Sequence, residues 1–319
     1  MARSAQSTKR CPYQELTLRD SHYRQMHATQ VRLVGCLIAL VSSSASPQRP
    51  VSDRALEQLA IGILEPRESE RDSSAARSIR GINLGIEEAQ RTARLFGWEV
   101  IALRSPDSLN SGDAMRFLAT QGVTAIVGNL TASLQFRSRL RSAPVLIDVE
   151  KRRGAPPDRC AQSAFHLLPL LDSAQWAAHN QRESWERFAG LVAWDPALER
   201  FGAAQLNERY RKRFGSEMDE NAWAGWMSIK ILVDAALRKG TKDPCALERF
   251  FVSTEAHFDG HKGVPLFFDP RTRELVQPLF ARRAAGEPEA VAIGLAPDTH
   301  VKLHRTRASP CPVACGSSQ

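Results

Sequence analysis

Three polar residues that follow a short apolar run, Asn129, Thr131 and Ser133, are the leading candidates for binding chemistry in this chain. The run, residues 123–127, is typical of a buried strand, and we expect a helix soon after it. The hydroxyl groups of Thr131 and Ser133 can donate and accept hydrogen bonds, and free amides at a helix start favour an anion such as a carboxylate. A loop of this kind can hold an anionic group, although Thr131 could instead serve only as the cap of that helix.

An earlier strand, helix and strand must position this loop. Residues 59–64 form an apolar run, and residues 98–103 form another. Between them, apolar residues recur at intervals of three and four, a spacing that places them on one face of an amphipathic helix. These residues are Ile79, Ile82, Ile86, Ala89, Ala93 and Phe96. Ser73 or Ser74 can cap the start of this helix, and Gly97 suits its left-handed end. A strand, a crossover helix and a second strand predict an α/β fold with a parallel sheet.

Ligand chemistry in such a sheet is expected at the carboxyl ends of the strands. Glu65 and Ser69 follow the first strand, so we expect them to line the same mouth as Asn129. Asp148 and Glu150 lie at the end of a fourth predicted strand, residues 145–149, and we expect their side chains to be solvated.

Motifs for other chemistry are missing from the sequence. It contains no nucleophile elbow, phosphate-binding glycine loop, zinc signature or paired catalytic carboxylates, so we expect neither an enzyme nor a cofactor. His257 and His261 have i, i+4 spacing, but Asp259 and Gly260 break the helix that a metal site would need. Trp223 and Trp226 lie three apart on a predicted amphipathic helix, where core packing is the expected role.

The second half of the chain contains further predicted elements. We expect strands near residues 164–168 and 191–194, and a helix from Asp195 to Phe214. Two more helices are predicted over residues 222–238 and 245–252. A hairpin is expected to pair residues 264–268 with residues 278–282.

The N-terminal region is typical of an export signal. The formal charge of the whole chain is +8, but no nucleic-acid-binding module accompanies it, so we expect no nucleic-acid partner. From Met26, a short basic segment precedes the apolar run of residues 33–41, and small residues follow to Ala45. We therefore expect a leader over residues 1–45, with Met26 as an alternative start, a linker over 46–57 and a periplasmic location. An exported chain permits disulfides among the cysteines beyond the leader: Cys160, Cys245, Cys311 and Cys315.

Four stretches, taken in order, resemble the type I periplasmic substrate-binding proteins, and most closely the leucine and branched-chain amino-acid-binding branch. They are residues 61–64 with Arg80-Gly-Ile-Asn-Leu-Gly-Ile-Glu-Glu88, then Gly122-Val-Thr-Ala-Ile-Val-Gly128, then residues 201–237, and then Phe258 to Asp269 with Gln277-Pro278. The resemblance covers residues 58–283 and implies a lobe assembled from two sequence segments. In that family, loop hydroxyls and amides after the strands hold the head group of an amino acid, and the matching loop here contains Asn129, Thr131 and Ser133.

One departure from the family concerns its second lobe. Family members have two lobes, and a domain of that kind normally takes on the order of a hundred residues. The resemblance implies that the second lobe begins after a crossover strand at residues 165–169, and the family pattern resumes at residues 191–194. Here only residues 170–190 lie between them. We therefore expect a reduced second lobe, and a flexible tail over residues 284–319.

The resemblance implies a solute-binding protein of an ABC-type amino-acid or amide importer. Its partners would be a small polar solute and the membrane subunits of the transporter. We expect attachment to the membrane only through the transporter, and a lipid anchor at Cys36 is a lesser alternative. A protein-interaction or sensor module on the same lobe, or a relic that binds nothing, remains open at this point.

Overall fold

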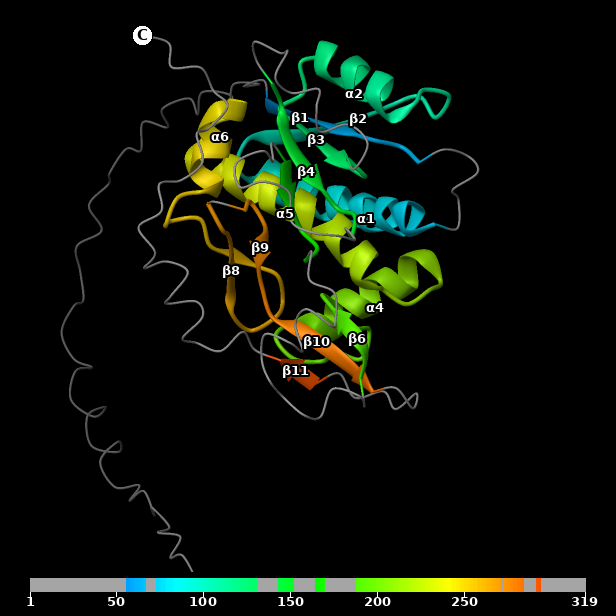
Figure 1. Ribbon diagram of the computed structural model, residues 1–319. Coiled ribbons are helices and arrows are strands. Elements are labelled where there is room, and N and C mark those ends of the chain that lie inside the picture. The colour runs from blue at the N-terminus through cyan, green and yellow to red at the C-terminus, as the bar shows by residue number, and fades with distance from the viewer. Residues whose placement is uncertain are drawn as a thin grey trace, which may run out of the picture. The chain divides into compact units, whose positions relative to one another are not determined.

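A five-stranded parallel sheet is the centre of the fold (Figure 1). The computed structural model describes residues 56–66, 73–130, 143–151, 164–169, 188–270, 272–283 and 291–293. The sheet has the order β2-β1-β3-β4-β5, and every neighbouring pair is parallel. Its strands are β1 (Glu57–Ile63), β2 (Trp98–Arg104), β3 (Ala125–Gly128), β4 (Val145–Asp148) and β5 (Ala164–His166). The α/β fold with a parallel sheet is confirmed.

Five helices accompany this sheet in the described residues. They are α1 (Ser74–Leu95), α2 (Ser111–Thr120), α4 (Ala203–Phe214), α5 (Glu220–Lys239) and α6 (Pro244–Phe251). Of these, α1, α2, α5 and α6 each carry a side-chain N-cap. The Ser73 hydroxyl caps α1 by accepting from the Ala76 amide, and Gly97 adopts the expected left-handed conformation with a φ of 77°. None of the helices in the described ranges is long and apolar enough to cross a membrane.

The two faces of the sheet bury different residues, as the alternation of side chains along a strand requires. Ile61 and Ile63 of β1 point into the larger core with α1 and α5. Ile126 and Leu146 point into a smaller core with Met115 of α2. Figure 1 shows α2 on one side of the strands and α1 with α5 on the other.

Helices α1 and α5 touch through their backbones. A Cβ atom added to Gly81 would lie 1.8 Å from the Ala222 carbonyl oxygen, and one added to Gly225 would lie 2.0 Å from the Ser78 carbonyl oxygen. Glycine inside a helix costs about 1 kcal/mol relative to alanine. Here it permits a contact that no other residue allows, and that contact joins the two distant segments of the chain into one core.

Six short strands form two further sheets. Strands β6 (Phe188–Val192), β10 (Leu279–Arg283) and β11 (Val291–Ile293) are antiparallel in the order β11-β10-β6. Strands β7 (Phe258–Asp259), β8 (Pro265–Phe268) and β9 (Leu275–Val276) form the other, also antiparallel. Strand β11 lies inside the segment that the sequence assigned to the tail.

The predicted hairpin has a different partner. Strand β8 pairs with β9, whereas residues 280–283 pair with β6. The turn closes early because the Asp269 carbonyl accepts from the Arg273 amide and the Asp269 amide donates to the Glu274 carbonyl. The prediction that residues 278–282 complete the hairpin was wrong.

Helix α4 also begins later than predicted, at Ala203 and not near Asp195. Phe201 and Gly202 have φ values of 57° and 87°, so two consecutive left-handed residues interrupt any earlier helix. Asp195 caps only a short turn, in which its carboxylate accepts from the Ala197 amide.

Several predicted segments lie outside the described residues. These are the leader and most of the linker (residues 1–55), the segment expected to replace the second lobe (residues 170–187 of 170–190), and most of the tail. The predictions made for them stay predictions.

A buried lysine joins the small sheets to the main core. The ammonium group of Lys262 donates to the carbonyl of Ala193, the side chain of Gln277 and, at 3.3 Å, the carbonyl of Pro278. It also lies 3.9 Å from the centroid of the Trp223 ring. Burial holds the pKa of Lys262 well below its usual range, and the nearby Glu220 carboxylate offsets only part of this effect.

The helix contact predicts a large effect of one methyl group. Gly81→Ala is expected to lower the free energy of unfolding by more than about 3 kcal/mol, the upper end of the usual overpacking cost, because the new Cβ meets backbone. The control is Gly112→Ala in α2, where the nearest atom lies 3.4 Å from the added Cβ and stability should be unchanged or raised by up to about 1 kcal/mol. Urea denaturation measures both, and equal stabilities of the two variants would contradict the contact.

The buried lysine predicts a pH dependence of stability. Between its lowered native pKa and its ordinary pKa, Lys262 carries fewer protons in the folded than in the unfolded state. The free energy of unfolding therefore gains a contribution that rises with pH between these two pKa values. Lys262→Met should remove that part of the slope, which denaturation at a series of pH values measures. A variant with the wild-type slope would show that the folded and unfolded pKa values are alike.

Candidate functional site

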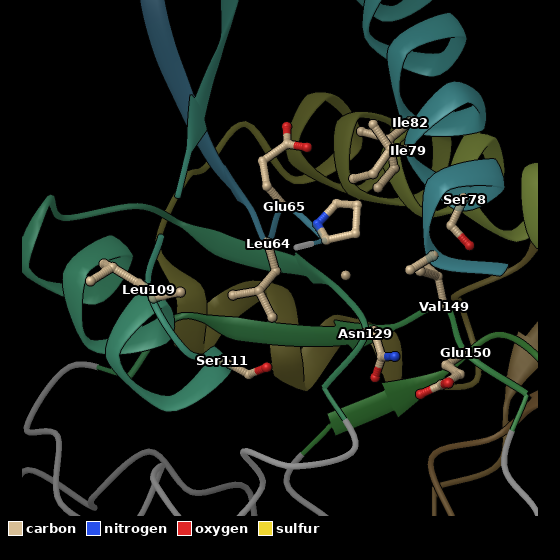
Figure 2. Close-up of a pocket in the computed structure, with 14 residues that line it drawn as sticks. Leu64, Glu65, Ser78, Ile79, Ile82, Leu109, Ser111, Asn129, Val149 and Glu150 are labelled. Atoms are coloured by element: carbon tan, nitrogen blue, oxygen red, sulfur yellow. The ribbon is translucent and has the colours of Figure 1, made fainter. Parts of the chain in front are cut away.

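A cleft of about 410 Å³ opens at the carboxyl edge of the main sheet (Figure 2). The loops after β1, β3 and β4 meet there with the first turns of α1 and α2. Its lining residues are Leu64, Glu65, Pro66, Ala75, Ser78, Ile79, Ile82, Leu109, Ser111, Ala114, Gly128, Asn129, Val149 and Glu150. The cleft is therefore at the strand edge where the sequence predicts ligand chemistry.

Two of the five predicted site residues lie in this cleft. Glu65 follows β1 and Asn129 follows β3, and both line it. Thr131, Ser133 and Ser69 lie outside the described residues, so their placement stays a prediction.

The wall formed by α1 was not predicted as part of the site. Ser78, Ile79 and Ile82 project from its early turns toward the strand ends, and Figure 2 shows them across the cleft from Leu109 and Ser111. The only signal in the sequence was the apolar stripe of the helix, which indicates burial but not a ligand.

Glu65 is held by Arg104, the last residue of β2, and by Ser105, which follows it. Its amide donates to the Ser105 hydroxyl at 3.0 Å, and its carboxylate forms an ion pair with Arg104. Arg104 also donates to the side chain of Asn83 on α1. These contacts fix the direction of the Glu65 side chain and offset its charge.

Asp148 is buried and not solvated, so that expectation was wrong. One carboxylate oxygen accepts from the Leu130 and Glu150 amides, both at 3.2 Å. The other lies 3.1 Å from Nδ1 of His166, and neither side chain is exposed. The cause is the parallel register, which places His166 of β5 beside Asp148 of β4. Asp148 thereby holds the loops that carry Asn129 and Glu150.

Close packing shapes the floor of the cleft. A Cβ atom added to Gly128 would lie 2.5 Å from Cβ of Leu64, so only glycine fits at the end of β3. The Leu64 amide donates to the Val127 carbonyl at 2.9 Å, which continues the pairing of β1 with β3 into the loop. This contact keeps Glu65 and Asn129 on neighbouring loops.

The arrangement is suited to non-covalent binding. Ala75 and Ser111 bring the first turns of two helices to the cleft, and α1 carries no acidic residue in its first turn. The positive end of the α1 dipole therefore favours an anionic group, while Ile79, Ile82 and Leu109 offer an apolar wall. Within the described residues there is no group of three or more His, Cys, Asp or Glu side chains that could hold a metal ion.

The role of Asp148 predicts a loss of stability on its removal. Asp148→Ala deprives the buried Leu130 amide, the half-buried Glu150 amide and the buried His166 ring of this partner. Leaving a buried polar group unsatisfied costs about 1–3 kcal/mol, so we expect a total loss of about 3 kcal/mol. The control Asp107→Ala removes an exposed carboxylate and should change stability by less than about 0.5 kcal/mol. Thermal unfolding measures both, and similar melting temperatures would contradict the proposed role.

The comparisons with known proteins find similarity in structure alone. The sequence matches no protein-family model and no curated protein. The structure is similar to an ABC-type branched-chain amino acid transporter protein from Rhodopseudomonas palustris CGA009, with 12% identity, a TM-score of 0.55, and coverage of 73% of this chain and 95% of that chain. It is also similar to a leucine-, isoleucine-, valine-, threonine- and alanine-binding protein from Brucella ovis in a closed conformation, with 8% identity, a TM-score of 0.52, and coverage of 75% and 95%.

A third similar structure contains a bound ligand. It is the solute-binding protein of an ABC transporter from Rhodopseudomonas palustris BisB5, in complex with 3,4-dihydroxybenzoic acid. Identity is 12%, the TM-score is 0.51, and the match covers 74% of this chain and 96% of that chain. Identities this low establish the fold and nothing finer. At that level the predicted resemblance is confirmed: this chain has the fold of the type I solute-binding proteins of ABC transporters.

Proposed function

We propose that this chain is an extracytoplasmic solute-binding protein of an ABC-type amino-acid or amide importer, in a reduced form. The observation that carries the proposal is the cleft of about 410 Å³ at the carboxyl edge of the parallel sheet. Pockets for small molecules commonly measure about 300–1,000 Å³ and lie at such strand edges in α/β folds.

The lining of the cleft fits a solute with a polar head and an apolar body. Asn129 supplies an amide that can donate and accept, and the first turn of α1 supplies a positive dipole end. Ile79 and Ile82 can pack against an aliphatic or aromatic body. Thr131 and Ser133, with Ser69, complete the proposed set of head-group contacts.

The ligands of similar structures suggest which solutes to test. The Brucella ovis protein is named for leucine and other small amino acids, and a Rhodopseudomonas palustris protein contains 3,4-dihydroxybenzoic acid. Both kinds of molecule combine a carboxylate with a body of limited size. If the second lobe is reduced, ligand is enclosed on one side only, and we expect weak affinity.

One structural observation supports export. Cys245 is bonded in a disulfide, and disulfides persist in oxidising compartments and are rare in the cytosol. This agrees with the leader proposed for residues 1–45, whose removal N-terminal sequencing of the mature protein would detect.

An interaction or sensor module is the second candidate. Leu95 and Phe96, at the end of α1, are 83% and 66% exposed, which is unusual for adjacent large apolar side chains. A contiguous apolar surface of this kind can mark a protein contact. This alternative is favoured if purified protein binds none of the tested solutes but self-associates in size-exclusion chromatography.

Binding at the cleft predicts the effect of one substitution. Calorimetric titration with leucine, other amino acids, short amides and 3,4-dihydroxybenzoate should find at least one ligand. Asn129→Ala should weaken that binding about three- to tenfold, the value of a neutral hydrogen bond, while thermal unfolding shows that the variant remains folded. The control is Gln121→Ala, an exposed amide at the end of α2 and outside the cleft lining, which should leave affinity unchanged. Unchanged affinity in Asn129→Ala would place the site elsewhere.

A further inference from the structure

A second cavity, the helix groove, lies between α1 and α5 and shares no lining residue with the cleft. The two helices touch at Gly81 and Gly225, and the groove opens farther along both helices, toward their C-terminal ends. Its volume is about 200 Å³. The lining residues are Gly85, Glu88, Ala89, Thr92, Trp226, Lys230, Val233, Asp234, Leu237 and His261.

The carboxylates of the groove already have cationic partners. Glu88 pairs with Arg209 of α4 at 2.6 Å and accepts from the Trp226 indole at 2.9 Å. Asp234 pairs with Arg238 one turn further along α5, at 3.2 Å. Neither carboxylate therefore brings an uncompensated negative charge to the groove.

The charge of Lys230 is not offset in this way. Its ammonium group lies 5.9 Å from the centroid of the Trp226 ring, and no carboxylate of the described residues lies within ion-pair distance of it. His261 adds no second cation at neutral pH, because burial lowers the pKa of its imidazole. Its Nδ1 lies 3.1 Å from the Phe201 carbonyl, and its ring stacks on Trp226 with centroids 5.3 Å apart.

The rest of the lining limits the ligand to a small, partly apolar molecule. Ala89, Val233 and Leu237 provide methyl, isopropyl and isobutyl surface beside the ammonium group. A volume of about 200 Å³ is below the roughly 300–1,000 Å³ of pockets for drug-sized ligands. A single cation beside a short apolar wall matches a carboxylate attached to a compact hydrocarbon body.

We propose that the helix groove is a second binding site, which takes a small organic monocarboxylate with its carboxylate on Lys230 and its body against Ala89, Val233 and Leu237. This site is independent of the proposed solute site at the strand edge. Helix α1 lines both cavities, through Ser78, Ile79 and Ile82 in one and Ala89 in the other.

The test uses isobutyrate and its uncharged analogue isobutyramide with the full chain. Isobutyrate should bind saturably and change tryptophan fluorescence, since Trp226 lines the groove. A hydrogen bond between charged groups contributes more free energy than one to an uncharged group. Isobutyramide should therefore bind at least about tenfold more weakly than isobutyrate. Equal affinities, or no saturable binding of isobutyrate, would overturn the proposal.

Three variants locate the binding. Lys230→Met should weaken isobutyrate at least about tenfold while the melting temperature shows that the fold persists. Lys239→Met removes an exposed lysine of the same helix, outside the groove lining, and should leave affinity unchanged. Asn129→Ala, in the strand-edge cleft, should also leave it unchanged. Wild-type affinity in Lys230→Met, or loss of binding in Asn129→Ala, would overturn the assignment to the groove.

Discussion

The contact between α1 and α5 determines how the rest of the structure is assembled. Gly81 and Gly225 let two helix backbones meet at a separation that any side chain would prevent. Helix α1 belongs to the first segment of the chain and α5 to the second, so this contact makes one core from both. It also sets the position of α1 relative to the strands. The cleft uses the early turns of α1 as a wall, and the helix groove opens between its later turns and α5.

The loops at the strand edge depend on a second buried interaction. Asp148 accepts from two loop amides and meets His166, so one carboxylate holds the loops after β3 and β4. A buried polar group of this kind costs free energy unless its partners are in place. Its partners here come from three separate parts of the chain. The shape of the cleft is therefore a property of the whole sheet and not of a single loop.

Local patterns predicted much of the fold. The apolar runs and the three- and four-residue spacing of α1 identify strands and helices because burial imposes those periods. Contacts between distant residues were not predictable in this way. The partner of Asp148 depends on the register of β4 with β5, and the late start of α4 depends on two left-handed residues that include Phe201, a residue type that rarely adopts that conformation. In the site, Glu65 and Asn129 were predicted because each follows the end of a predicted strand. The wall formed by α1 was not predicted.

The central claim is that the strand-edge cleft holds a solute. A crystal structure of the chain grown at saturating leucine or 3,4-dihydroxybenzoate tests it most directly. The account predicts ligand density in the cleft, with a polar group within hydrogen-bond distance of Asn129 and the apolar body against Ile79 and Ile82. Ligand density at another place, or an empty cleft at saturating concentrations of both compounds, would contradict it.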